Sequence, residues 1–116
     1  MNLDLAAAAL LSLATEDRFG LYEAIAELNR LFPDESLDRK YDVAKEALAY
    51  LYQKGWIQFE NVIDSTEHLQ ASPISDADVP AMLSDRANWH PPHSDERVTF
   101  SSTDAGFKAY MATSET

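Results

Sequence analysis

The sequence predicts a mainly α protein that carries one small antiparallel β-hairpin, an α+β fold. Three observations lead to this prediction. Apolar residues repeat at three- and four-residue spacing through the first half of the chain, which is typical of amphipathic helices. Residues 43–59 pass from such a helix through a glycine directly into an alternating strand. A second alternating strand follows near residue 98 and runs into a short closing helix.

Length and composition predict one domain. A chain of 116 residues suits one hydrophobic core, and we assign residues 1–112 to a single domain and residues 113–116 to a loose tail. Hydrophobic residues make up 46% of the chain, which is ordinary for a globular protein and disfavours disorder. The chain has no cysteine, which excludes a disulfide scaffold, a thiol nucleophile and a cysteine-based zinc site.

The first predicted helix covers residues 3–14 and is apolar and alanine-rich. It is too short to span a bilayer, and Asp4 stands where a signal peptide would carry a basic residue. We therefore expect a cytoplasmic protein with no membrane association. A helix that is apolar on nearly all sides is buried in the core or packs on a second subunit. A homodimer formed through this helix or through the closing helix is one expectation.

The next two segments predict a pair of amphipathic helices, over residues 19–32 and 37–54. Pro33 ends the first of them, because the residue before a proline is pushed out of the α region. Gly55 is placed to end the second in a left-handed conformation. The two apolar stripes consist of Leu21, Ile25, Leu28 and Phe32, and of Tyr41, Ala44, Leu48 and Leu51.

Residues 56–63 and 97–101 alternate apolar and polar side chains, which predicts an antiparallel pair of strands that covers the helices. The connection between them, residues 64–96, is long for a hairpin. Within it we predict a short helix near residues 78–86. We also expect Trp89 to tuck against the domain.

The last predicted element is a helix capped by Thr103. We expect its larger apolar side chains to point inward. These side chains belong to Phe107, Tyr110 and Met111.

This order of elements resembles the winged helix-turn-helix superfamily, and more closely a group of small uncharacterised bacterial winged-helix-like proteins. The motifs that carry the resemblance are Thr103-Asp-Ala-Gly106, Leu31-Phe-Pro-Asp34, Leu51-Tyr-Gln-Lys-Gly55 and Trp89-His-Pro91. The resemblance implies three helices, a two-stranded wing with a helical insertion at residues 64–96, and a closing helix. It implies no activity, because a fold alone does not specify a function.

By the same resemblance, the helix over residues 37–54 would be the recognition helix in a major groove of DNA. Arg39 and Lys40 at its start have the chemistry to read guanine or to hold phosphate. On the side of this helix that faces away from its apolar stripe, we expect residues that contact DNA or a protein partner. They are Arg39, Lys40, Val43, Glu46, Tyr50 and Gln53.

The charge favours a protein partner over DNA. The net charge is −11, and only the segment 38–54 carries more basic than acidic side chains. Most of the surface therefore lacks the Lys and Arg that displace counterions from phosphate. We predict a protein-interaction or regulatory module that binds a basic protein, with a DNA-binding transcriptional regulator as the alternative. The predicted acidic contact surface consists of Asp64, Glu67, Asp76 and Asp78.

No pattern of catalytic residues is recognisable. The chain has three glycines, no phosphate-binding loop and no serine–histidine–aspartate arrangement. His90 and His93 have a spacing that zinc can use, but two prolines between them favour an extended loop that splays the rings apart. We therefore predict a non-catalytic protein with no metal and no cofactor.

Overall fold

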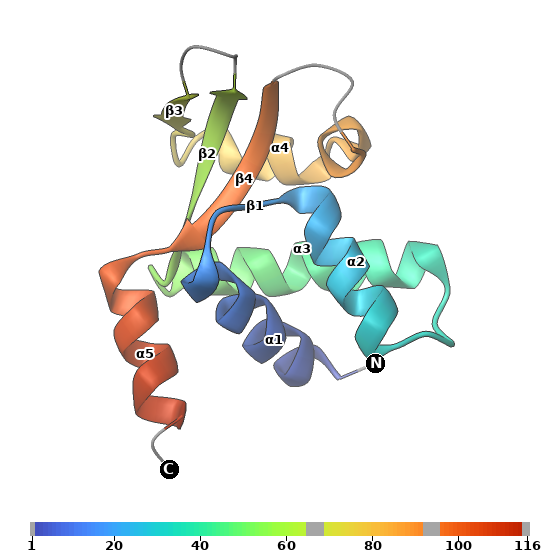
Figure 1. Ribbon diagram of the computed structural model, residues 1–116. Coiled ribbons are helices and arrows are strands. Elements are labelled where there is room, and N and C mark those ends of the chain that lie inside the picture. Colours follow the sequence, from blue (N-terminus) through green and yellow to red (C-terminus); the bar gives the residue numbers. More distant parts are fainter. Residues whose placement is uncertain (1, 65–68, 92–95, 115–116) are drawn as a thin grey trace.

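The structure is a computed structural model that describes residues 2–64, 69–91 and 96–114. It belongs to the α+β class, with five α-helices and a four-stranded antiparallel sheet in those residues (Figure 1). The elements are α1 (Leu3–Glu16), β1 (Phe19–Gly20), α2 (Leu21–Leu31), α3 (Leu37–Gln53), β2 (Ile57–Asp64), β3 (Leu69–Pro73), α4 (Val79–Ser84), the 3₁₀ helix η1 (Arg86–Trp89), β4 (Glu96–Ser102) and α5 (Asp104–Ser114).

The sheet has the order β1-β4-β2-β3. The predicted pairing of the two longer strands is confirmed, with Phe59 of β2 opposite Phe100 of β4. The expectation of only two strands was wrong. Phe19, which was expected to lie in the second helix, is extended and pairs with Phe100 from the other side. β3 pairs with β2 inside the connection, and its five residues are all exposed, so that they carry no alternating burial signal.

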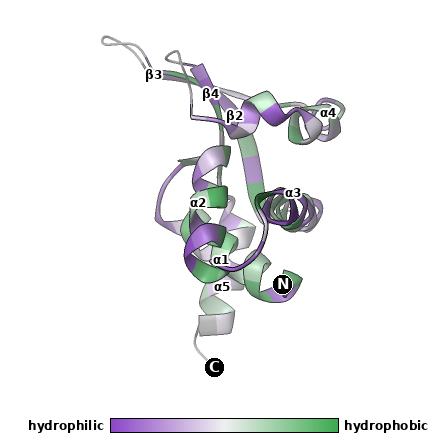
Figure 2. Ribbon diagram, turned by 90° about the vertical axis from the view of Figure 1, so that its right-hand side faces the viewer, coloured by the Kyte–Doolittle hydropathy of each residue, from purple (hydrophilic) through white to green (hydrophobic). Residues whose placement is uncertain are grey.

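The core lies between the first three helices and one face of the sheet. Phe59 and Phe100 are fully buried there, together with Leu10, Leu28 and Leu48 from the three helices. Figure 2 shows α3 and α4 on the same side of β2 and β4. α3 therefore lies between α1 and the segment that carries α4, and this position leaves only a narrow part of its surface open.

The end of α3 is a glycine-based cap, as the sequence predicts. Gly55 has φ 75°, its N–H donates to the Tyr52 carbonyl at 2.9 Å, and the Trp56 N–H donates to the Leu51 carbonyl at 3.0 Å. These two bonds satisfy carbonyls that the helix end leaves unpaired. The turn delivers the chain directly into β2 and holds Trp56 beside the last turn of α3.

The start of α5 is fixed against that same turn. The Thr103 hydroxyl donates to the Gly55 carbonyl at 2.6 Å and accepts from the Gly106 N–H at 3.1 Å, so the predicted cap is confirmed. The Thr103 N–H donates to the Trp56 carbonyl at 3.0 Å. A Cβ at Gly106 would lie 1.9 Å from that Trp56 oxygen. Only glycine therefore allows this approach.

The rest of α5 packs differently from the prediction. Phe107 and Met111 are 48% and 39% exposed, so the expectation that they point inward was wrong. Only Tyr110, whose hydroxyl lies 3.4 Å from the Ser12 hydroxyl oxygen, is partly buried against the core. The helix continues to Ser114, past the expected boundary at residue 112. In the described part of the chain, no helix is long and apolar enough to cross a membrane.

Candidate binding surfaces beside helix α3

The α3 ridge is the exposed side of α3 that carries Arg39, Glu46, Tyr50 and Gln53, and it is narrower than the sequence predicts. Lys40 and Val43 are 6% and 3% exposed, so the expectation that they lie on the open face was wrong. Both share a helical face with Ala47, which is fully buried, and α1 packs along α3. A buried lysine of this kind places its aliphatic stem in the core and its ammonium at the rim. The predicted contact residues that remain exposed are Arg39, Glu46, Tyr50 and Gln53.

The connection between β3 and β4 covers a second side of α3. The Trp89 ring meets the Tyr41 ring edge-on at 6.1 Å, and its Nε1–H donates to the Leu83 carbonyl at 2.9 Å. The Arg86 guanidinium lies 4.0 Å from the centre of the Tyr41 ring and 3.4 Å from the Asp38 carboxylate. The prediction that Trp89 tucks against the domain is confirmed, since it is buried.

A second attachment joins α3 to the segment that precedes α4. The Tyr52 hydroxyl donates to the Asp76 carboxylate, while its ring lies 5.4 Å from the Phe59 ring. The hydrogen bond to Asp76, and then partial burial, raise the pKa of Tyr52 above its usual value. The Ile74 N–H donates to the Phe59 carbonyl at 3.1 Å and continues the β3 pairing toward this point. Tyr52 therefore positions the start of α4 beside α3.

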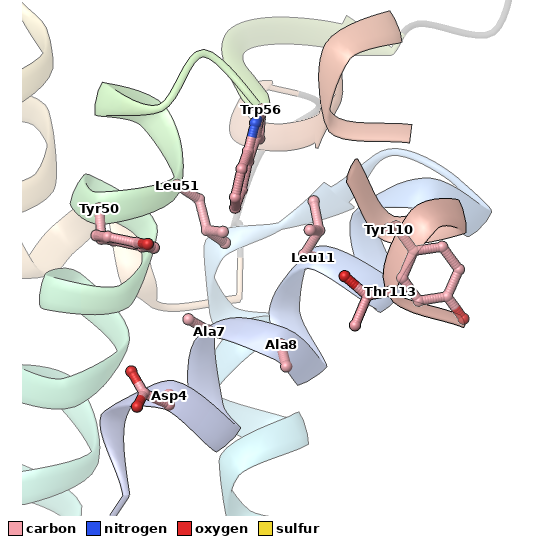
Figure 3. A pocket seen from close by; sticks show the side chains of 9 residues that line it. All are labelled: Asp4, Ala7, Ala8, Leu11, Tyr50, Leu51, Trp56, Tyr110 and Thr113. Atoms are coloured by element: carbon pink, nitrogen blue, oxygen red, sulfur yellow. The ribbon is translucent and has the colours of Figure 1, made fainter. Parts of the chain in front are cut away.

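One apolar hollow, the α1–α5 groove, lies on one side of the α3 ridge and has a volume of about 250 Å³. Figure 3 shows Tyr50 and Trp56 on one side of it, with Tyr110 and Thr113 from α5 on the other. The small side chains of Ala7 and Ala8 on α1 leave the space between these two walls open. The complete lining is Asp4, Ala7, Ala8, Leu11, Tyr50, Leu51, Trp56, Tyr110 and Thr113.

A second hollow, the α4 groove, lies on the other side of the ridge and has a volume of about 290 Å³. Its lining is Ala49, Tyr52, Gln53, Asp76, Val79, Pro80 and Leu83. Two residues that the sequence predicts as contacts thus line different grooves, Tyr50 the α1–α5 groove and Gln53 the α4 groove. Neither groove was predicted, because each combines residues from segments far apart in the chain.

Aromatic and basic side chains meet at the upper end of the α1–α5 groove. The Tyr50 and Trp56 rings meet edge-on at 6.4 Å. The Lys54 ammonium lies 5.7 Å from the centre of the Tyr50 ring and 6.0 Å from that of Trp56. Such contacts hold a cation over the ring face. Both rings also line the groove and contribute apolar area to it.

The structure separates the predicted acidic residues. Asp76 lines the α4 groove, and Asp78, close by, accepts from the Ser75 hydroxyl at 2.9 Å. Asp64 ends β2 at the opposite end of β3 and lies 3.8 Å from the Arg97 guanidinium. Glu67 falls outside the described residues. Only Asp76 and Asp78 therefore belong to one local surface.

Among the described residues, no three or more His, Asp or Glu side chains are grouped so that they could hold a metal ion. His90 is exposed and directly follows η1. The prediction for His93 falls outside the described residues.

The comparisons with known proteins return nothing. No protein-family model, no curated protein and no solved structure matches the chain.

Proposed function

We propose that this protein is a non-catalytic protein-interaction module on a winged-helix-like frame, and that it binds a basic partner at the α4 groove and the adjoining α3 ridge. The observation that carries the proposal is an apolar hollow of about 290 Å³ that has one charged residue, Asp76, in its lining. On the same face of α3 as Ala49, Asp42 and Glu46 are exposed together with one basic residue, Lys45, so that acidic side chains outnumber basic ones around the groove. Apolar anchors supply affinity at such interfaces, and the charged border supplies orientation.

The partner that this surface fits is an amphipathic segment with basic side chains. An amphipathic helix places its apolar side chains in a hydrophobic groove at three- and four-residue spacing. Lysine or arginine beside those anchors would meet Asp76, Asp42 and Glu46. The net charge of −11 would also speed the encounter with a basic protein. The support for the winged-helix-like frame is the order α1, α2, α3, β2, β4 and α5, to which β1, β3 and α4 are additions.

A DNA-binding regulator is the weaker alternative. Arg39 supports it, because this residue is exposed in the first turn of α3. Lys40, the other basic residue expected to contact DNA, is buried. Asp42 and Glu46 share the open face with Arg39, and these carboxylates would repel phosphate. The segment that packs on Tyr41 also covers one side of the helix that would have to enter a groove.

The first experiment uses fluorescence anisotropy with a labelled helical peptide of leucine and lysine at moderate salt. We expect binding, and we expect Ala49→Arg to weaken it by about tenfold or more, because the arginine fills the groove and repels the peptide. Ala8→Arg, the same change in the α1–α5 groove, is the matched control and should leave the affinity unchanged. If both variants change the peptide affinity equally, the peptide responds only to the net charge of the protein. This result would overturn the assignment to the α4 groove.

A second peptide separates the apolar contribution from the charge. A lysine–serine peptide of the same charge should bind far more weakly than the leucine–lysine peptide. Duplex DNA provides the remaining arm of the experiment. Binding to DNA that persists at moderate salt and is lost in Arg39→Glu would replace the proposal by the DNA-binding alternative.

A further inference from the structure

We infer that the α1–α5 groove is a self-association site, into which a second copy of this chain inserts the apolar strip of its α5. This inference does not depend on the proposed function, because it uses the other side of α3 and needs no foreign partner. Three features of α1 and α5 support it: an exposed apolar strip, a groove next to that strip, and complementary charges.

The apolar strip runs along one side of α5. Phe107 and Met111 are one helical turn apart and are 48% and 39% exposed. Tyr110 lies on the same side of the helix and lines the groove, so that the strip and the groove are continuous. Figure 1 shows α5 extending away from the sheet. Large apolar side chains gathered on one exposed helix face mark an interaction surface.

The groove beside the strip is built to take large side chains. Ala7 and Ala8 on α1 leave a hollow of about 250 Å³ between Tyr50 and Tyr110. Leu5, which is 51% exposed, extends the apolar area of α1. Because each copy carries both the strip and the groove, a two-fold axis lets each strip enter the groove of the other copy. This is the closed, isologous arrangement that most homodimers use.

The charges of this surface suit a second copy of the same chain. The net charge of −11 would make most pairs of faces repel each other. Asp4 lines the groove, whereas α5 exposes Lys108 three residues before Met111 and Asp104 one turn before Lys108. In the two-fold arrangement Lys108 of each copy faces Asp4 of the other, which gives two opposite-charge contacts. The border of the α4 groove is less suited to a second copy, because three acidic residues, Asp76, Asp42 and Glu46, outnumber one basic residue, Lys45.

Sedimentation equilibrium of the whole chain tests the inference. We expect a monomer–dimer equilibrium, and we expect Phe107→Asp to raise the dimer dissociation constant by about tenfold or more, because it places a charge in the apolar contact. Leu69→Asp is the matched control, as Leu69 is 55% exposed on β3, away from this surface. A wild-type protein that stays monomeric, or a dimer unaffected by Phe107→Asp, would overturn the inference.

A charge exchange tests the arrangement of the two copies. Asp4→Lys and Lys108→Asp should each weaken the dimer, and the double variant should recover the wild-type dissociation constant. Circular dichroism confirms that each variant is folded. If the double variant dimerises no better than the single variants, α5 does not lie in the groove as inferred. Ala49→Arg should leave dimerisation unchanged, so a failure of the peptide experiment is distinguishable from a failure of this one.

Discussion

The two grooves beside α3 have similar volumes, about 250 and 290 Å³, yet they are built in different ways. The α1–α5 groove is floored by core residues of α1, and its α5 wall is fixed by Thr103 and Gly106 against the end of α3. The α4 groove depends on the segment between β3 and β4, which is attached to α3 through Trp89 and Tyr52. Single substitutions should therefore remove one groove and leave the other intact.

The charges of the two grooves differ as much as their construction. Asp4 is the charged residue in the lining of the α1–α5 groove, and Lys108 is exposed on α5 outside that lining. The α4 groove has Asp76 in its lining, and Asp42, Lys45 and Glu46 are exposed on the adjoining face of α3. The two grooves therefore have similar volumes but different charged neighbours. Each of the following variants is designed to break one side of this comparison.

The largest effect is expected for Trp89→Ala. The substitution leaves a cavity beside Tyr41 and removes the hydrogen bond to the Leu83 carbonyl. We expect a loss of about 4 kcal/mol in the free energy of unfolding, measured by urea denaturation. Where the variant is still folded, it should lose peptide binding and keep dimerisation. Retained peptide affinity in a folded Trp89→Ala protein would show that the attachment of α4 does not form the site.

Gly106→Ala should act on the opposite side of α3. The added Cβ would meet the Trp56 carbonyl oxygen at 1.9 Å, so α5 must move away from the end of α3. We expect a loss of about 3 kcal/mol in the free energy of unfolding and a dimer dissociation constant raised by about tenfold or more. Peptide binding at the α4 groove should persist. A Gly106→Ala protein with wild-type stability would contradict the close approach of these two segments.

Tyr52→Phe tests the hydrogen bond to Asp76 while it keeps the ring beside Phe59. We expect a loss of about 1 kcal/mol or less, because this hydrogen bond is partly exposed to solvent. The pKa of Tyr52 is raised on folding. Its contribution is therefore complete below the unfolded pKa near 10 and decreases as the pH rises through the folded pKa.

Urea unfolding at about pH 8 and about pH 11 checks this dependence. The stability difference between wild type and Tyr52→Phe should shrink at the higher pH. Tyr22, whose pKa is raised mainly by burial, is present in both proteins. Its contribution therefore cancels in the difference. A difference that grows with pH would have the wrong sign for a protonated Tyr52 donor.

The smallest effect is expected at the ion pair between Arg86 and Asp38. Both side chains are more than half exposed, at 53% and 88%, so Asp38→Asn should cost less than about 0.5 kcal/mol. Arg86→Ala should cost more, about 1 kcal/mol, because it also removes the contact over the Tyr41 ring. Thermal unfolding of the two variants shows which substitution costs more stability. A larger loss of stability for Asp38→Asn would show that the ion pair, and not the contact of Arg86 with the Tyr41 ring, attaches this segment to α3.

Sequence periodicity anticipated the elements that carry repeated burial. α1, α3, β2, β4 and the glycine cap at Gly55 all follow from spacing and from the conformational freedom of glycine. The short strands escaped prediction for a physical reason. β1 has two residues, and β3 is exposed along its whole length, so neither has an alternating pattern. Their place is set by hydrogen bonding to β4 and β2.

The candidate site was likewise predictable only in part. The sequence identified α3 as the helix to examine, and four of its six predicted contact residues are exposed: Arg39, Glu46, Tyr50 and Gln53. Burial of Lys40 and Val43 could not be predicted, because it depends on how α1 lies along α3. The exposure of Phe107 and Met111 likewise depends on the angle at which α5 leaves Gly106.

The sequence by itself therefore determined the α+β class, the ends of α3, the pairing of β2 with β4 and the acidic character of the surface. These properties follow from local spacing, from single residues such as Gly55, or from simple counts of charge. Only the tertiary structure decided which sides of α3 stay open and where the two grooves form. Each groove joins residues distant in the chain, such as Asp4 with Tyr110, and such contacts leave no periodic signal.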